Sequence, residues 1–313
     1  MDLWTGSAPL RRADLLAAGV SAKELYGAVA AGHLTRLRRG IYLPARLRSS
    51  GAGPGAPDEF DRHLDAVRGA LCRLHTPVVV SHLSAAALHG LEPWGLPMRR
   101  VHVTRDRPTG ARRRSDLDLH ASPLTSGEIV SRHGIAVTSV PRTVVDVARS
   151  VPFEQAVVVA DAALRLEGAT VGSLHDALHR ARGWPGVTAA ERVVRFADGR
   201  SASVGESRSR VRIHQAGLPV PDLQHNVVDS GGEWLARVDF RWDGTPPVIG
   251  EFDGKGKYGR MLRPGQKPGD VVFEEKRRED ALRRAGSEVV RWTWDDLDEF
   301  APTAAHLRRL LRY

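Results

Sequence analysis

The sequence contains very little cysteine and no long apolar run. Cys72 is the only cysteine among 313 residues, which excludes a disulfide within the chain and a zinc site built from several cysteines. No stretch approaches the roughly 18 consecutive apolar residues that cross a bilayer. The first residues also lack the charged and apolar regions of a secretory signal. We therefore expect an intracellular, cytoplasmic protein in a reducing compartment, with no membrane partner.

Lysine is scarce relative to arginine. The formal net charge is +9, and arginine supplies most of the positive side chains. Such a balance favours a polyanionic partner, because the guanidinium fork fits phosphate oxygens. Genomes rich in G and C also enrich arginine, so the charge gains weight only where motifs agree with it. Nucleic acid is the leading partner on this basis.

The chain is long enough for two or three domains with their own cores. Residues 50–57 are rich in glycine and proline and read as a linker or loop. We expect a multidomain α+β and α/β protein with domains at 1–49, 50–200 and 201–313. The first is a winged helix-turn-helix, the second an α/β domain, and the third a mixed sheet flanked by helices.

The N-terminal segment has the pattern of a winged helix. Residues 10–19 predict a short helix closed by glycine, and Ser21 is the N-cap of a second helix that runs to Ala31. Residues 33–43 alternate apolar and basic side chains around Gly40, as a β-hairpin wing does. This segment resembles the N-terminal domain of AbiEi-family antitoxins of type IV toxin-antitoxin systems.

That resemblance implies DNA binding. The second helix would enter the major groove, and three arginines in four residues of the wing would contact phosphates. The alternative is a winged helix used only for protein contacts. The residues expected at the DNA are Ser21, Lys23, Glu24, Tyr26 and Gly27 on the helix, and Arg36, Arg38 and Arg39 on the wing.

The middle region alternates predicted helices and strands. Its segments 81–86 and 139–146 resemble sequences of AbiEi-like proteins. Residues 105–114 form an arginine-rich loop that we expect to be solvated or to touch phosphate. The region also contains scattered histidines, for which we expect hydrogen bonding or solvation rather than metal binding, because their spacing matches no metal motif. These are His82, His89, His102 and His120.

The C-terminal region presents carboxylates on two apolar, strand-like runs, at 237–242 and 248–254. A hairpin and period-two alternation would point Asp239, Glu251 and Asp253 to one face. Gathered oxygen ligands suit Mg²⁺ or Mn²⁺, which can polarise a phosphodiester and activate water. The alternative reading makes Asp239 an edge-strand charge and pairs Glu251 with Arg237.

Residues 204–310 resemble the branch of the PD-(D/E)xK nucleases that is similar to very-short-patch-repair endonucleases. The resemblance rests on Glu206 in its helix, Asp239, and the run Glu251-Phe-Asp-Gly254. Asp253 stands where the superfamily has its usual lysine. The resemblance implies Mg²⁺ or Mn²⁺ as cofactor and leaves open which basic residue acts at the phosphate or faces the bound strand: Lys255, Lys257, Lys276, Arg277 and Arg278, with Tyr258 where related domains often have histidine.

Two functions remain open from the sequence. In the first, the chain is a DNA-binding, Mg²⁺-dependent endonuclease that uses Glu206, Asp239 and Glu251 with Asp253. In the second, it is a non-catalytic regulator of antitoxin type with a cognate toxin as partner. A homodimer fits a winged helix on a pseudopalindrome, although no heptad segment enforces one.

Overall fold

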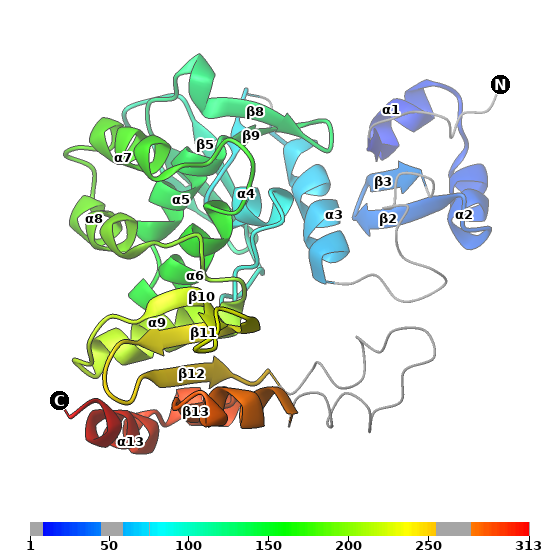
Figure 1. Cartoon of the computed structure of the whole chain (residues 1–313). Helices are drawn as coiled ribbons and strands as arrows, with labels where there is room; N and C mark the ends of the chain where they lie inside the picture. Colours follow the sequence, from blue (N-terminus) through cyan, green and yellow to red (C-terminus); the bar gives the residue numbers. More distant parts are fainter. Residues whose placement is uncertain (1–8, 45–58, 75, 255–276, 313) are drawn as a thin grey trace. The chain divides into compact units, whose positions relative to one another are not determined.

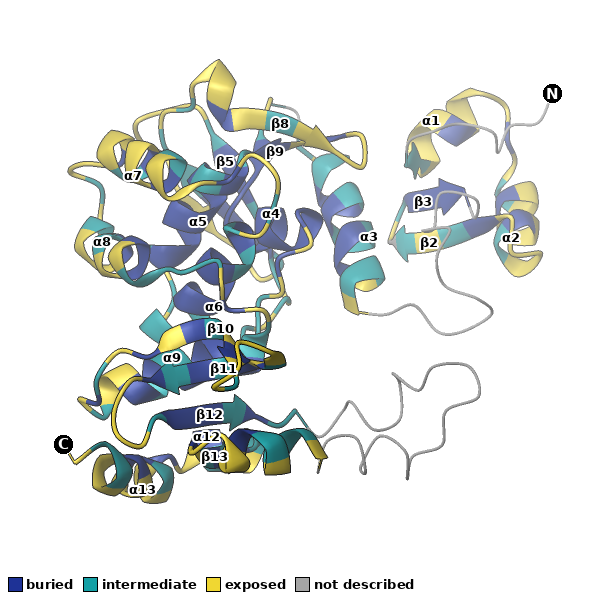
Figure 2. Cartoon of the chain, in the orientation of Figure 1, coloured by how far each residue is buried: buried dark blue, intermediate teal, exposed yellow. Residues whose placement is uncertain are grey.

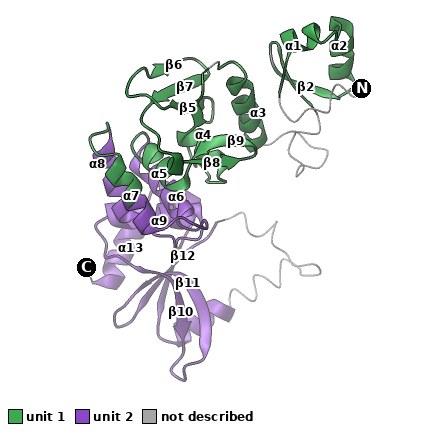
Figure 3. Cartoon of the chain, turned by 90° about the horizontal axis from the view of Figure 1, so that it is seen from above, with its two compact units in different colours: residues 1–150, 176–185 green, residues 151–175, 186–313 purple. Residues whose placement is uncertain are grey.

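The computed structural model describes residues 9–44, 59–74, 76–254 and 277–312, and it has a mixed α/β architecture with three separate sheets (Figure 1). The chain divides into two compact units (Figure 3). Unit 1 comprises residues 1–150 with 176–185, and unit 2 comprises 151–175 with 186–313. Within the described ranges, no helix combines the length and apolarity needed to cross a membrane.

The N-terminal part of unit 1 is a three-stranded sheet with two short helices. The sheet order is β1-β3-β2, and both pairings are antiparallel. The predicted order of two helices followed by a hairpin is confirmed. The elements are β1 (Leu10–Arg11), α1 (Arg12–Ala17), α2 (Ala22–Ala30), β2 (Leu34–Arg38) and β3 (Ile41–Pro44).

Local signals set the boundaries of these elements. Gly19 follows α1 with a φ of +89°, a conformation that glycine adopts without a steric penalty. Gly40, with a φ of +78°, turns the chain between β2 and β3. Leu25 of α2 and Leu34 of β2 then meet in a small core that closes this part of the molecule.

The rest of unit 1 is built on a six-stranded mixed sheet of order β6-β7-β5-β4-β9-β8. Its apolar core lies between this sheet and the helices α3 and α4. The alternation of helices and strands expected for this region is confirmed. The elements are α3 (Glu59–Leu71), β4 (Val79–Val80), α4 (His82–Leu88), β5 (Val101–Arg105), β6 (Arg112–Arg113), β7 (Leu117–Ala121), the 3₁₀ turn η2 (Ser126–Glu128), β8 (Ile129–Arg132), β9 (Ile135–Thr138) and α5 (Val140–Ala148).

Three helices follow, and two of them pack in unit 2. These are α6 (Phe153–Ala163), α7 (Val171–Arg180) and α8 (Val187–Phe196). Helix α6 contacts both α8 and the first helix of the C-terminal sheet region. The sequence-based boundaries at 49 and 200 stay a prediction, and the compact units place 151–175 and 186–200 with the C-terminal sheet.

The C-terminal part is a four-stranded sheet of order β10-β11-β12-β13, so β11 and β12 are interior strands. The first three strands are antiparallel, and β13 runs parallel to β12. Figure 2 shows β12 largely buried. The elements are α9 (Val204–Gln215), β10 (Asp222–Val228), β11 (Trp234–Trp242), β12 (Val248–Phe252), a helical stretch at 277–284, β13 (Glu288–Trp292), α12 (Trp294–Asp298) and α13 (Ala301–Leu311).

Two glycines permit close packing around this sheet. A Cβ atom on Gly250 of β12 would lie 2.4 Å from the ring of Trp292, and one on Gly205 of α9 would lie 1.9 Å from the ring of Phe252. Both distances are far below normal carbon contacts. The absence of a side chain at these two positions therefore lets the aromatic rings fill the core.

Candidate functional site

The first half of α2 is fixed by a capping box and presents an exposed face. The Ser21 hydroxyl accepts a hydrogen bond from the Glu24 amide at 3.2 Å, and the Glu24 carboxylate accepts one from the Ser21 amide at 2.8 Å. Hydrogen bonds to the Glu24 carboxyl, first from the Ser21 side chain and then from the Ser21 backbone, lower the pKa of Glu24. Lys23 is exposed, and Tyr26 is 65% exposed. Helix α2 therefore offers Lys23 and Tyr26 outward, while Ser21 and Glu24 hold its start.

The β2–β3 hairpin adds positive charge. Arg36 lies on β2 and Arg39 in the turn, and both are exposed. Among the described residues, neither side chain forms an ion pair. Arg38 also belongs to β2, but its side chain lies outside what the structure describes. The hairpin thus presents two guanidinium groups that are available to an external anion.

A second arrangement joins Glu206 on α9 to Asp239 on β11. The amide of Gln224, on the edge strand β10, donates to Glu206 Oε2 at 2.7 Å and to Asp239 Oδ1 at 3.1 Å. Gln224 has a φ of +53°, a costly conformation that persists only where its surroundings fix it. The other oxygen of Asp239 accepts from the Phe252 amide of β12 at 2.9 Å. Two carboxylates from distant parts of the sequence are therefore gathered around one amide.

Glu206 also caps α9. Its carboxylate accepts from the Ala202 amide at 2.8 Å and from the Ser203 hydroxyl at 2.9 Å. Burial raises the pKa of Glu206 above its usual value, and the nearby Asp239 carboxylate raises it further. The two carboxylates therefore repel each other. The hydrogen bonds to Glu206 only partly offset the rise in its pKa that burial and this repulsion cause.

The other predicted site residues are placed differently. Glu251 forms an ion pair with Arg278 at 2.7 Å, whereas the alternative sequence reading had paired it with Arg237. Asp239 lies on an interior strand rather than on an edge. Within the described ranges, no three His, Cys, Asp or Glu side chains form a group suited to a metal ion.

The remaining predicted residues are only partly described. Arg277 is exposed, and the Asp253 amide donates a hydrogen bond to the Trp292 carbonyl. The others lie outside the described residues: Lys255, Lys257, Tyr258 and Lys276.

The arginines of the Glu206 segment have a structural role that the sequence reading missed. Arg208 pairs with Glu154 of α6 and Asp298 of α12, each at 2.8 Å. Arg210 pairs at 2.6 Å with Asp161 of α6, a residue with no exposed surface. These ion pairs fasten α9 to α6 and α12. Only the three-dimensional neighbourhood reveals them, because their partners lie 49 to 90 residues away.

Three of the four histidines considered in the middle region lie together. The rings of His82 and His120 stack with centroids 3.6 Å apart, and His102 Nδ1 lies 3.1 Å from His120 Nε2. Burial, more than any neighbouring charge, lowers the pKa of His102 to about 4 and that of His120 to about 3. Of the two expected outcomes for these three histidines, hydrogen bonding and solvation, the structure shows hydrogen bonding within a stack in which His82 is buried and His102 and His120 are partly buried.

The segment 139–146 supplies a buried ion network. Arg142 of α5, only 1% exposed, pairs with Asp146 at 2.9 Å and with Glu128 at 3.3 Å, and its guanidinium lies over the ring of Trp184. Burial raises the pKa of Asp146 despite these cations. The network explains the arginine and aspartate of this segment through packing within unit 1.

Comparison with known proteins identifies the N-terminal part. Residues 8–45 match the family described as "Transcriptional regulator, AbiEi antitoxin". The chain carries an N-terminal domain of AbiEi antitoxin type. The matched range contains the capped helix α2 and the basic β2–β3 hairpin, which supports a DNA-binding regulator. The resemblance of residues beyond 45 to AbiEi-like proteins, and that of 204–310 to nucleases, stay predictions.

The chain is also similar to proteins of Mycobacterium tuberculosis. The uncharacterized proteins MT2308 and Rv2248, from two strains, are each 33% identical to it over 159 residues. That stretch is 51% of this chain and 56% of each relative, so the chain spans little more than half the length of these curated relatives. The crystal structure of the RV2827C protein aligns with a TM-score of 0.38 at 14% identity, covering 64% of this chain and 75% of that one.

Proposed function

We propose that the protein is a DNA-binding transcriptional regulator of antitoxin type. The observation that carries the proposal is the placement of exposed Lys23, Tyr26, Arg36 and Arg39 on a capped helix and its hairpin, inside the range that matches the antitoxin family. The start of α2 enters the major groove, and the hairpin arginines bind the flanking phosphates. Ser21 holds the first turn of α2, and Arg38 remains among the residues expected at the DNA.

The proposed partners follow from this role. The main one is an operator sequence in duplex DNA, and a cognate toxin is the protein partner. A pseudopalindromic operator would be bound by two copies of the chain. Exposed Arg277 belongs to the residues expected near nucleic acid.

Binding of fluorescent duplex DNA from the region upstream of the gene tests the proposal. The double substitution Arg36→Ala and Arg39→Ala should weaken binding at least tenfold and lower the slope of log affinity against log salt by about 2, because two phosphate contacts are lost. The matched control is Arg195→Ala with Arg309→Ala, two exposed arginines on α8 and α13 whose loss changes the net charge equally. Equal weakening in both double variants would sink the proposal.

A second function is favoured by one observation, the Glu206–Gln224–Asp239 arrangement. We propose that it belongs to a metal-dependent endonuclease site, to which Asp253 and either Lys255 or Lys276 would contribute. Its carboxylate oxygens are donors of the kind that Mg²⁺ or Mn²⁺ takes, although Glu251 is held by Arg278. A bound ion would relieve the repulsion between Glu206 and Asp239 and polarise a phosphodiester. Gln224 holds the two carboxylates close together by donating a hydrogen bond to each.

Cleavage of supercoiled plasmid with Mg²⁺ or Mn²⁺ tests this second function. Wild type should nick the plasmid, and Asp239→Asn should abolish nicking, because the mutation removes one of the two gathered charges. Asp243→Asn is the control, since Asp243 lies just beyond β11 with a side chain that is 90% exposed. No cleavage by wild type, with DNA binding intact, leaves the regulator as the function.

A further inference from the structure

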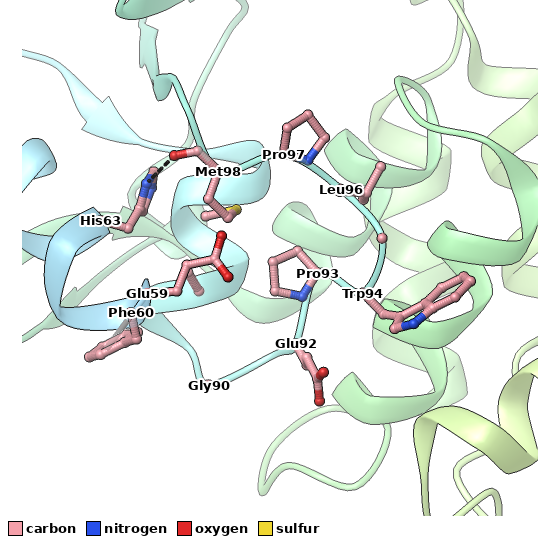
Figure 4. A pocket seen from close by; sticks show the side chains of 12 residues that line it. Glu59, Phe60, His63, Gly90, Glu92, Pro93, Trp94, Leu96, Pro97 and Met98 are labelled. Carbon is pink, nitrogen blue, oxygen red and sulfur yellow. Dashed lines mark hydrogen bonds between the residues drawn. The ribbon is translucent and has the colours of Figure 1, made fainter. Parts of the chain in front are cut away.

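A cavity of about 760 Å³ opens between the start of α3 and the loop at 90–98 that follows α4 (Figure 4). Cavities that hold drug-sized molecules in proteins span roughly 300–1,000 Å³. This one lies wholly within unit 1 and shares no residue with the proposed DNA surface or with the Glu206–Asp239 arrangement. Its size therefore suits a small organic molecule that neither proposed function requires.

The walls of the cavity are mainly apolar. Phe60 of α3 lies on one side, and Trp94, Leu96 and Met98 of the loop lie on the other. All four side chains are only partly buried, so they retain apolar surface that a ligand could cover. The lining therefore favours an aliphatic or aromatic body.

The charge of the cavity is negative in a chain that is otherwise strongly positive. Glu59 and Glu92 line it, and among the residues that the structure describes no lysine or arginine does so. Figure 4 shows the Glu59 side chain directed into the space between Met98 and Pro93. Both carboxylates are exposed, and the chain as a whole carries a charge of +9. An uncompensated pair of acids beside apolar walls is complementary to a cation with an apolar body.

His63 holds the cavity wall in place. Its Nδ1 lies 3.0 Å from the Met98 carbonyl, which can only accept, so Nδ1 carries the proton and donates. Its Nε2 then accepts from the Ser84 hydroxyl at 2.9 Å, while that hydroxyl accepts from the His102 amide at 2.8 Å. Burial lowers the pKa of His63, so the ring is neutral and adds no positive charge to the lining. The loop is thus tied through Met98 to α3 and α4.

From these observations we propose that the cavity binds a small organic cation, an aromatic or aliphatic body that carries an ammonium or amidinium group. The apolar body lies against Phe60, Leu96 and Met98, and the cationic group lies at Glu59 and Glu92. His63 is a positioning residue that fixes the loop.

Three probes of the same length but different charge test the proposal: 4-phenylbutylamine, 4-phenylbutanol and 4-phenylbutyrate. Their binding to the full chain is measured by calorimetry at low salt. The amine should bind roughly fivefold more tightly than the alcohol, as expected for exposed charge pairs, and the acid more weakly than both. Added salt should reduce the preference for the amine.

Variants then locate the site. Glu59→Gln with Glu92→Gln should bring the amine to the affinity of the alcohol, whereas Glu167→Gln with Glu233→Gln, two exposed acids in unit 2, should leave the preference unchanged. Leu96→Ala should weaken all three probes, and circular dichroism confirms that each variant is folded. Equal affinities for the three probes, no binding at millimolar concentration, or a preference that survives the Glu59 and Glu92 substitutions would overturn the proposal.

Discussion

Arginine has opposite roles in the β2–β3 hairpin and in α9. Arg36 and Arg39 of the hairpin are exposed, and neither has an ion pair among the described residues. Arg208 and Arg210 of α9 are nearly buried and lie within 2.8 Å of carboxylates on other helices. The same side chain thus faces external anions in one region and holds helices together in the other. Net charge alone therefore overstates how much of this basic chain is available to nucleic acid.

The largest effect is expected when an arginine that pairs with a buried carboxylate is removed. Arg210→Ala leaves Asp161 fully buried without its cation, and loss of one member of a buried pair costs about 3–5 kcal/mol. Urea unfolding followed by tryptophan fluorescence should show this loss of stability. Because burial already raises the pKa of Asp161, the loss should be smaller at pH 5 than at pH 8, where the carboxyl is charged.

The exposed arginine Arg195 is the control for this experiment. It pairs with Glu191 on the surface of α8, and its side chain is 72% exposed. Arg195→Ala should change the unfolding midpoint very little, as is usual for surface pairs. Equal losses in the Arg195 and Arg210 variants would contradict the contrast between the two kinds of arginine.

The stack of His82, His102 and His120 should make the stability of the folded chain depend on pH. Folding lowers the pKa of His102 to about 4, whereas the unfolded chain binds this proton near pH 6.5. The free energy of unfolding is therefore unaffected by this group above about pH 6.5. It falls as the pH drops towards 4, by roughly 3 kcal/mol for His102, because the unfolded chain takes up the proton first. Thermal unfolding between pH 7 and 4 measures it. His102→Gln should flatten the dependence, and His306→Gln, at an exposed site on α13, should not.

In the N-terminal part, loss of the N-cap of α2 should reduce both stability and DNA binding. Ser21→Ala removes the hydroxyl that accepts from the Glu24 amide, and loss of such a cap costs about 1 kcal/mol. Both the thermal midpoint of the N-terminal part and its affinity for duplex DNA should fall. Ser21→Thr keeps a capping hydroxyl and should retain both. Unchanged DNA affinity in Ser21→Ala would argue against α2 as the DNA-reading helix.

The smallest expected effect concerns the two gathered carboxylates. Asp239→Asn keeps an oxygen that can accept from the Phe252 amide but removes the negative charge. The pKa of Glu206 should fall towards its usual value and remain above it, because burial persists. Carbon-13 NMR titration of the Glu206 carboxyl measures this. An unchanged pKa in Asp239→Asn, or an equal fall in Asp243→Asn, would show that Asp239 is not the source of the repulsion.

Elements with local signals were predictable from the sequence. The Ser21 cap, the glycine between α1 and α2, and the turn at Gly40 act over a few residues, and the structure has the helices and hairpin that they predict. Helix α5 likewise has a local signal, because its first turn contains Pro141. Short pieces without such signals were missed, including the two-residue strand β6 and the edge strand β8.

The partners of the charged residues were not predictable, because they depend on distant segments. The resemblance to nucleases placed Glu206 and Asp239 in one site, but Gln224, which joins them in the structure, lies on a strand with no motif. Glu251 was placed with Asp239 by strand alternation, yet Arg278 takes its carboxylate. The histidine stack combines three elements whose spacing carries no pattern. Ion pairing and stacking are decided by tertiary neighbours, which periodicity does not encode.

The tight fit around Gly250 also bears on how relatives of this protein should be recognised. Any side chain there would collide with Trp292, and Gly205 is constrained in the same way by Phe252. Core packing alone is therefore enough to require glycine at both positions, whatever the protein does. A substitution at either position would test the packing of this sheet and not a catalytic role.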